Sequence, residues 1–419
     1  MPLRSAGDAL NGEDTMKTRI FAVTALAAAL ALTACSSPGG GDKADSKDPF
    51  TVVFIAGVTG NQASTAASEK IALEAAVKEI NDDGGILGRK VVIESYDSKS
   101  DPTEAVTVLK KRLASGVKPD LVRAGLSSGE TLALAPLLTR EKIPAWTSAA
   151  APQAGDSKAY PYLKLIGGSA TRTGEAGRDY IESLGVKSLA VLASEDAAGD
   201  GQVEAQKALY KDTGITVKDY RYSTTDIDLT VAYQRVVADK PDMIFLDSAS
   251  EPLTTRVLTA RNSIAGATDI PVFGGSGTSS TLTTALNTLP EAAFKDFHIA
   301  LYGVQLALPE NEQTAQYKTW KAAQGDVSNL VAPSIVYDGM RMYAAAMEDA
   351  KSTDAQKAID AINDKNWKPG FFVTYMDAKV DYDDTTNFPI LGADAYAIVQ
   401  VSKTVNGQFP PLDLYPPKK

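Results

Sequence analysis

Short apolar runs alternate with helical patterns along this chain, and this alternation constrains the fold more than any other feature. The first run, Thr51 to Ala56, is apolar enough for a strand that is buried on both faces. A helix is predicted from Thr65 to Asn81, because apolar residues recur on one of its faces. Further strands, each preceded by a helix or a turn, are expected at Lys90 to Tyr96, Leu121 to Ala124 and Ile143 to Trp146. Such repeats predict an open parallel sheet with helices on both sides.

The same pattern starts again in the second half of the chain. Strands are expected there at Ser188 to Ala193, Ile215 to Tyr222, Met243 to Leu246 and Pro271 to Phe273. Near the C-terminus, the Asn-Gly pair at 406–407 is typical of a hairpin turn. The chain therefore predicts two α/β lobes with a cleft between them, and ligands of open α/β sheets bind at the carboxyl ends of the strands.

The N-terminal segment has the layout of a secretory signal. Basic residues between Met16 and Arg19 precede an apolar stretch, Ile20 to Leu32. This stretch of roughly 13 residues is shorter than the ~20 that a membrane-spanning helix needs. Leu32 to Cys35 resembles a bacterial lipobox, which implies cleavage before Cys35 and acylation of its thiol. An ordinary secreted protein with an unused cysteine is the alternative.

We therefore expect residues 1–35 to comprise upstream residues and a lipoprotein signal peptide, with Met16 as the true start. Residues 36–49 are rich in Ser, Gly, Pro, Asp and Lys, so a flexible tether is predicted. The globular part then begins at Phe50. This arrangement predicts an extracytoplasmic protein that the lipid on Cys35 anchors to the cell membrane.

The composition excludes several classes of protein. Cys35 is the single cysteine, so the chain cannot form an internal disulfide. The formal net charge of -10 is opposite to the basic face that nucleic-acid binding requires. We predict a monomer with no cofactor, no metal site and no nucleic-acid partner.

The same counts bear on catalysis. His298 is the single histidine and lies in a strand-like run, which favours a structural or surface role. With one histidine and one cysteine, the chain cannot assemble a Ser-His-Asp triad, a Cys-His pair or a multi-histidine zinc site. We predict that the protein is not an enzyme. A hydrolase that uses carboxylates, or a serine with a lysine base, is the remaining alternative.

One part of the sequence resembles a known family. Ala75 to Asn81, followed by Gly84 to Arg89, is close to a signature of the periplasmic binding proteins of the leucine/isoleucine/valine type, the type I solute receptors of ABC importers. The resemblance runs from about Thr51 to Gln400. Further matches lie at Asp101-Pro102, Ser127 to Thr131, Ile143-Pro144 and Tyr337 to Gly339.

The resemblance implies two Rossmann-like lobes with parallel sheets, joined by three hinge crossings, that close on a ligand and deliver it to a membrane permease. The crossings are expected near Gly167-Gly168, Leu301 to Gly303 and Lys368 to Gly370. Residues 50–167 and 303–369 would then form lobe 1, and residues 168–302 and 370–419 would form lobe 2. A lipoprotein that reports its ligand to a membrane receptor or regulator is the alternative function.

Ser127 and Ser128 are the first candidates for ligand contact. They follow a strand and precede a helix, so their hydroxyl and backbone N–H groups can bind a carboxylate or amide oxygen near the positive end of the helix dipole. Either serine can instead be only the N-cap of that helix. Aligned on the family motif, Ser128 takes the place of a serine that holds the amino-acid carboxylate.

The next loop corresponds to the family's second ligand loop. It contains Thr147, Ser148, Ala149 and Ala150, and the position that is a threonine in the family is an alanine here. Backbone contacts to a ligand can persist without that hydroxyl. Trp146, just before the loop, can stack on a ligand or belong to the core.

In lobe 2 the candidates are Ala198, Ser250 and Ser276. Ala198 stands where the family has an aromatic residue, and Ser276 lies in the loop where the family often carries an acid that pairs with the ligand's ammonium group. A buried ammonium without an anion is costly. These replacements predict a carboxylate- or amide-bearing, amino-acid-like ligand that lacks a conventional α-ammonium group and is larger or more apolar than leucine at the lobe 2 end. Four acids on neighbouring loops can compensate, although carboxylates at loop ends are more often solvated: Asp247, Glu195, Asp196 and Glu251.

Overall fold

The computed structural model describes residues 48–415, apart from 249, 326–328, 368–371, 377 and 393–394. The predicted signal peptide, Cys35, most of the tether and the crossing predicted at 368–370 lie outside the described residues. Within the described ranges, no helix combines the length and the apolar character that a membrane span requires.

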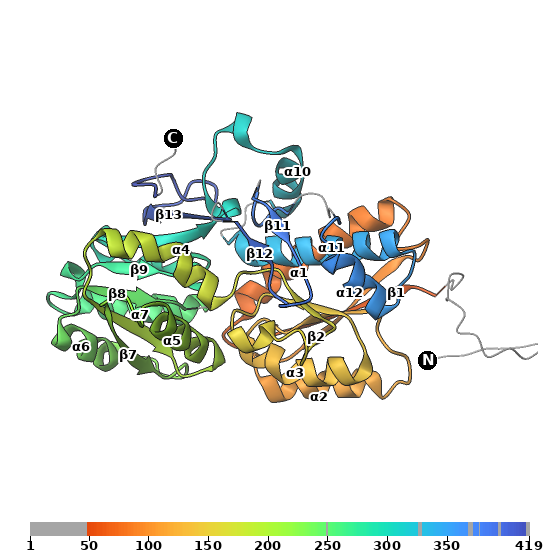
Figure 1. Ribbon diagram of the computed structural model, residues 1–419, viewed down its shortest axis with the longest axis horizontal. Helices are drawn as coiled ribbons and strands as arrows, with labels where there is room; N and C mark the ends of the chain where they lie inside the picture. Colours follow the sequence, from red (N-terminus) through yellow and green to blue (C-terminus); the bar gives the residue numbers. More distant parts are fainter. Residues whose placement is uncertain are drawn as a thin grey trace, which may run out of the picture. The chain divides into compact units, whose positions relative to one another are not determined.

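Lobe 1 is built on a five-stranded parallel sheet in the order β2-β1-β3-β4-β5. Its strands are β1 (Phe50–Ala56), β2 (Val91–Asp97), β3 (Leu121–Ala124), β4 (Ala145–Thr147) and β5 (Leu163–Leu165). One face packs against α1 (Ala63–Asp82) and α11 (Val331–Ala350), and the other against α2 (Pro102–Leu113) and α3 (Ser128–Glu141), as Figure 1 shows. Alternate side chains of β1 enter these two cores, which explains why its sequence is apolar throughout. Lobe 1 also holds the helices α10 (Ala315–Gln324) and α12 (Ala355–Asn363).

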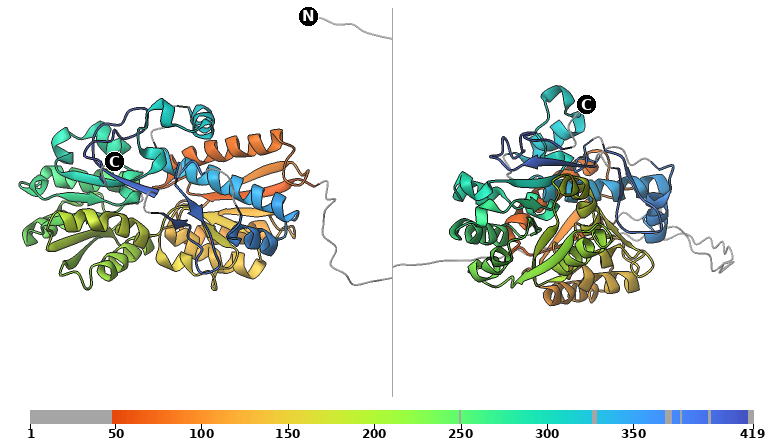
Figure 2. Two further views of the ribbon diagram at one scale, coloured as in Figure 1. Left: turned by 45° about the horizontal axis from the view of Figure 1, so that its top comes forward. Right: turned by 60° about the vertical axis from the view of Figure 1, so that its left-hand side comes forward.

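Lobe 2 has a six-stranded sheet in the order β13-β10-β9-β8-β6-β7. Its strands are β6 (Ser188–Ser194), β7 (Thr216–Tyr222), β8 (Met243–Leu246), β9 (Val272–Gly274), β10 (Phe297–Tyr302) and β13 (Tyr396–Gln400). All neighbours are parallel except β13, which runs antiparallel beside β10 and is dark blue in Figure 2. The helices are α4 (Ala170–Ser183), α5 (Ala197–Leu209), α6 (Thr230–Asp239), α7 (Glu251–Ser263), α8 (Ser276–Ser279) and α9 (Thr283–Thr288). The predicted α/β class with two mainly parallel sheets is confirmed.

The chain passes between the two sheets three times. The first passage follows β5 and includes Gly167 and Gly168, and the second follows β10 at Gly303. The third lies between β12 (Ile390–Leu391) and β13, about twenty residues later than the predicted crossing at 368–370. The reason is a short antiparallel pair, β11 (Val380–Asp381) with β12, that stays on lobe 1.

Side-chain hydrogen bonds of Tyr382 and Asn387 hold the segment that contains β11 and β12 on lobe 1. The phenol of Tyr382 donates to the carbonyl of Leu165 at 2.7 Å, and the amide of Asn387 donates to the carbonyls of Ala154 and Tyr160, each at 3.1 Å. The predicted division, which gave residues 370–419 to lobe 2, therefore differs from the structure for the described part of 372–391.

Tyrosines gather where the chain passes between the lobes. The ring of Tyr302 lies 5.6 Å from that of Tyr375 and 5.2 Å from that of Tyr396. Tyr375 donates to the carbonyl of Ile166, and the N–H of Gly168 donates to the hydroxyl of Tyr302 at 3.2 Å. All three passages thus meet in one buried cluster.

Gly339 in α11 allows this helix to approach the sheet of lobe 1 closely. A Cβ atom at position 339 would lie 2.2 Å from Cδ1 and 2.5 Å from Nε1 of Trp146. Trp146 is fully buried and also packs near the ring of Tyr343, at 6.3 Å between centroids. This contact places Trp146 in the core.

We expect Gly339→Ala to lower the free energy of unfolding by up to about 2 kcal/mol. Overpacking a core costs about 1–3 kcal/mol, and alanine regains ~1 kcal/mol over glycine in helix propensity. Urea unfolding measures the change. Trp146→Ala removes the indole atoms that the new methyl group would meet, so the double variant should lose less than the sum of the single variants, and strict additivity would contradict the contact.

Candidate functional site

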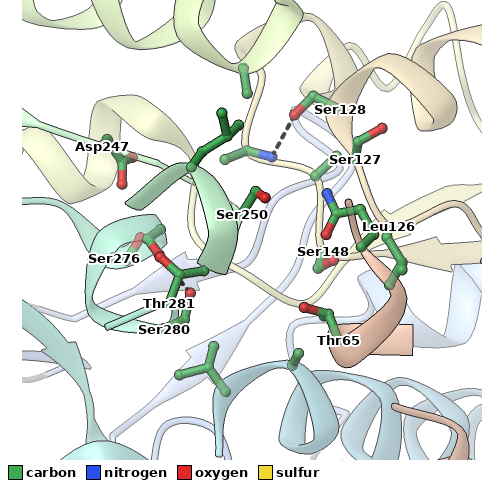
Figure 3. Close-up of a pocket in the computed structure, with 18 of the residues that line it drawn as sticks. Thr65, Leu126, Ser127, Ser128, Ser148, Asp247, Ser250, Ser276, Ser280 and Thr281 are labelled. Carbon is green, nitrogen blue, oxygen red and sulfur yellow. Dashed lines mark hydrogen bonds between the residues drawn. The ribbon is translucent and has the colours of Figure 1, made fainter. Parts of the chain in front are cut away.

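A cavity of about 300 Å³ lies between the two lobes, at the carboxyl ends of strands from both sheets. Its volume is at the lower end of the range for ligand pockets. Figure 3 shows Ser128 and Ser148 on one side of it and Asp247 and Ser276 on the other. All sequence-predicted ligand residues except Trp146 and Thr147 line this cavity, namely Ser127, Ser128, Ser148, Ala149, Ala150, Ala198, Ser250 and Ser276.

Trp146 and Thr147 do not reach the cavity because they belong to β4 itself and not to the loop after it. Strand side chains alternate between the two faces of a sheet, where helices cover them. Thr147 is fully buried, with its Oγ1 2.8 Å from Oγ1 of Thr131 and accepting the N–H of Ala149 at 3.2 Å. The structure therefore gives Thr147 a supporting role behind the second loop.

Ser127 and Ser128 use their hydroxyl groups differently. Ser127 is the N-cap of α3: its Oγ accepts the N–H of Glu130 at 3.1 Å and donates to the Glu130 carboxylate at 2.9 Å. Ser128 Oγ instead accepts the N–H groups of Ala150 and Ala151, at 3.3 and 3.2 Å. A hydroxyl that already accepts two bonds has its proton left to donate. Of the two serines, Ser128 is the one that can donate to a ligand.

The hydroxyl group of Ser148 is also free to donate to a ligand. Its Oγ accepts an N–H of the buried Arg123 at 3.0 Å, so its proton is also left to donate. Ser148 lines the cavity beside Ser128 in lobe 1. Lobe 1 thus presents two hydroxyl donors.

The wall from lobe 2 has the opposite polarity. Asp247 follows β8 directly and is half-buried, and its carboxylate accepts the N–H of Thr278 at 3.0 Å and an N–H of the Gln202 amide. Gln202 Oε1 is buried and has no hydrogen-bond partner among the described residues. Burial raises the pKa of Asp247 to about 6, against the lowering effect of the backbone and amide donors around it. This wall offers acceptors to a ligand.

Two glycines leave the room that the Asp247 carboxylate occupies. A Cβ on Gly275 would lie 2.7 Å from Cγ of Asp247, and one on Gly277 would lie 2.5 Å from its Oδ1. The loop around Ser276 contains no acid, but Asp247, in the neighbouring loop after β8, places its carboxylate beside Gly275 and Gly277. The prediction that the ligand lacks an α-ammonium group depended on the absence of an acid here, and this geometry removes that basis.

The expectation of a more apolar lobe 2 end also differs from the structure. The lobe 2 residues of the wall are largely polar and include Ser194, Asp196, Gln202, Thr224, Asp247, Ser250, Ser276, Ser280 and Thr281. Asp196 and Asp247 have no lysine, arginine or histidine beside them among the described lining residues, and Glu69, which also lines the cavity, forms an ion pair with Arg123. The charge of the cavity wall therefore favours a ligand that carries a protonated nitrogen.

Several lining residues were missed in the sequence. Gln62 directly precedes α1, and Thr65 and Glu69 lie in its first two turns; their position after β1 is a signal that the strand-end rule provides. Gln202 lies inside α5 and Tyr302 ends β10, and neither has a local signal. Such residues reach a site only through the packing of the two lobes.

The two lobes also touch at the rim of the cavity. Ser64 donates to Glu251 at 3.3 Å, and Ser250 donates to the carbonyl of Asn61 at 3.3 Å. A Cβ on Gly201 would lie only 2.6 Å from Cδ of Pro152 in the other lobe. These contacts describe a closed arrangement.

We expect Gly201→Leu to weaken ligand binding about tenfold, because the new side chain opposes closure and affinity falls with the population of the closed state. Gly201 does not line the cavity, so the contacts to the ligand themselves stay intact. Calorimetric titration gives the affinity, and small-angle scattering gives the expected increase in radius of gyration. Glu204→Leu, at an exposed position of the same helix, is the control. Equal affinities of both variants would contradict the role of the rim.

The sequence matches the family model described as "Periplasmic binding protein" over residues 49–406. The Leu/Ile/Val-binding protein BraC3 of Rhizobium johnstonii is 27% identical over 57% of this chain, and the match spans 64% of BraC3, slightly less than two thirds. The leucine-, isoleucine-, valine-, threonine- and alanine-binding protein of Pseudomonas aeruginosa is 24% identical over 75% of this chain and 82% of its own length.

Solved structures agree with the fold. The substrate-binding protein LivJ of Streptococcus pneumoniae, in complex with isoleucine, has a TM-score of 0.68 at 20% identity, covering 86% of this chain and 97% of its own. A solute-binding protein of R. palustris in complex with 4-hydroxybenzoate has a TM-score of 0.70 at 22% identity, covering 86% and 95%. The resemblance seen in the sequence is confirmed, and it is to binding proteins and not to enzymes. The chain belongs to the periplasmic binding protein family.

Proposed function

We propose that this protein is the solute-binding component of an ABC importer. It captures a small carboxylate- or amide-bearing, amino-acid-like solute in the interlobe cavity and delivers it to a membrane permease. The observation that carries this proposal is the pair of free hydroxyl donors, Ser128 and Ser148, at the start of α3 and after β4. Donors beside a helix N-terminus are suited to a carboxylate or amide oxygen.

The opposite wall supports a ligand with a protonated nitrogen. Asp247 is a half-buried carboxylate whose hydrogen-bond donors Gln202 and Thr278 are neutral, and an ammonium group would supply the missing counter-charge. A carboxylate toward lobe 1 and an ammonium toward lobe 2 describe a zwitterion.

The rest of the cavity limits the size and nature of the side chain. Leu126, Leu253, Val331 and Ile335 supply apolar contacts, and Tyr302 is the only aromatic residue among the described lining residues. The solved structures of similar fold hold ligands that range from isoleucine to 4-hydroxybenzoate. The charges and the small volume favour the amino-acid end of this range.

Anchoring is a separate part of the proposal. A lipid on Cys35 would hold the protein outside the cytoplasm, beside its permease. Mass spectrometry of the N-terminal peptide tests this part: the wild-type peptide should begin at Cys35 and carry the added mass of the lipid, and the peptide of Cys35→Ser should lack that added mass.

Two measurements test capture and its ligand class. Native mass spectrometry of the purified protein identifies a solute that is carried through purification. Calorimetric titration of ligand-free protein then compares L-leucine, L-alanine, 4-hydroxybenzoate, acetamide and urea. We expect an amino acid to bind most tightly.

Two outcomes would contradict the proposal. Tight binding of a solute with neither carboxylate nor amide would overturn the ligand class. Uptake of the solute by cells that is unchanged after deletion of the protein would overturn the import role.

A further inference from the structure

Arg123 is a buried cation that lies one hydroxyl group away from the cavity. It belongs to β3 in the middle of the lobe 1 sheet, and its side chain is 0% exposed. One terminal nitrogen, Nη2, donates to Oε1 of Glu69 at 2.7 Å and to Oγ of Ser148 at 3.0 Å. The other, Nη1, donates to the carbonyl of Gly125.

Stability alone does not explain this ion pair. Replacing a buried pair by apolar residues of similar volume is often neutral or stabilising. The pair is also incompletely satisfied, since Oε2 of Glu69 and Nε of Arg123 are buried without hydrogen-bond partners among the described residues. Burial raises the pKa of Glu69, against the lowering effect of Arg123.

Ser148 connects this charge to the cavity. A hydroxyl oxygen that accepts a bond from a guanidinium is polarised, and its own proton becomes a better donor. Ser148 lines the cavity, where the described wall contains no cationic side chain. Arg123 is thus placed to act on a ligand through one hydrogen bond.

We propose that Arg123 is a positioning residue that provides, through Ser148, the positive charge for the ligand's carboxylate. The inference rests on the proposed function and makes it narrower: of a carboxylate and its amide, the cavity prefers the carboxylate. Glu69 limits this preference by competing for the same guanidinium.

The test compares acids with their amides, which have nearly the same shape. The probe pairs are L-leucine with L-leucinamide, 4-hydroxybenzoate with its carboxamide, and acetate with acetamide, titrated by calorimetry into ligand-free protein. In the wild type we expect at least one acid to bind more than about tenfold more tightly than its amide. Glu69→Gln should increase this ratio several-fold. Glu69→Gln with Arg123→Gln should reduce it to nearly one.

Glu69→Gln should raise the acid-to-amide affinity ratio and the double variant should lower it, and this difference distinguishes a positioning role from a structural one. A merely structural ion pair would make both variants weaken acid and amide alike. Ser148→Ala leaves the ion pair in place and should also remove the preference, which keeps the test usable if the double variant does not fold. The inference is overturned if the wild type shows no preference for any acid, or if Ser148→Ala and the double variant retain it. A co-purified solute without a carboxylate would overturn this inference and leave the capture role intact.

Discussion

Asp247→Asn is expected to weaken the binding of an amino-acid-like solute about 100-fold, because a hydrogen bond to a charged group is worth roughly 1.5–3 kcal/mol. Its carboxylate is half-buried and held by Thr278 and Gln202, so the substitution changes the charge with little change of shape. Titration calorimetry with L-leucine measures the loss.

The pH dependence provides the control for this prediction. The pKa of Asp247 is raised by burial to about 6, so at pH 5 the free protein holds a mostly neutral acid. Affinity for a protonated amine should therefore fall as the pH decreases from 7 to 5. The affinity of Asp247→Asn should not show this fall, because asparagine does not titrate. An affinity ratio of wild type to variant that is constant from pH 5 to 8 would contradict the assignment.

The same shift predicts a change in stability. A carboxyl group whose folded pKa is raised binds protons more tightly in the folded state, so its ionisation disfavours folding as the pH rises from about 4 to 6. At pH 7 the ligand-free Asp247→Asn variant should consequently melt no lower than the wild type. If Asp247→Asn is more stable than the wild type but binds the ligand more weakly, Asp247 serves ligand binding at a cost in stability.

Ser128→Ala is expected to weaken binding of a carboxylate ligand by about 30-fold to 100-fold, because it removes a donor and releases the N–H groups of Ala150 and Ala151. Ser127→Ala is the matched control. It removes the N-cap of α3, which should lower the free energy of unfolding by about 1 kcal/mol. Its effect on affinity should stay within threefold. A larger loss of affinity for Ser127→Ala than for Ser128→Ala would show that the free donor is misassigned.

Much of the fold could be predicted from local patterns. The strand at β1 is apolar throughout because both of its faces are buried, and Asp101 caps α2 by accepting the N–H of Glu104 at 2.7 Å, as the Asp-Pro-x-Glu sequence indicates. The third passage between the lobes could not be placed, because β11 and β12 are two residues long and leave no periodic pattern.

The loops that form the site could be predicted from the sequence, but the hydrogen-bond partners of their side chains could not. Strand ends identified the loops of Ser128 and Ser276, but the states of the Ser128 and Ser148 hydroxyls depend on distant partners, Ala151 and Arg123, that only the folded chain reveals. The direction of Asp247 depends on glycines in the next loop of the sheet. Arg123 did leave a signal, since a charged residue inside a four-residue buried strand needs a partner.

The tyrosine cluster at the three passages makes the motion of the lobes optically observable without an attached dye. Tyr302, Tyr375 and Tyr396 pack together where any change of the angle between the lobes must alter their contacts. The buried indoles Trp146 and Trp320 belong to the core of lobe 1, and we expect their environment to change less. Near-ultraviolet circular dichroism should therefore show solute-dependent change in the phenol bands, with the indole bands of these two residues as an internal reference.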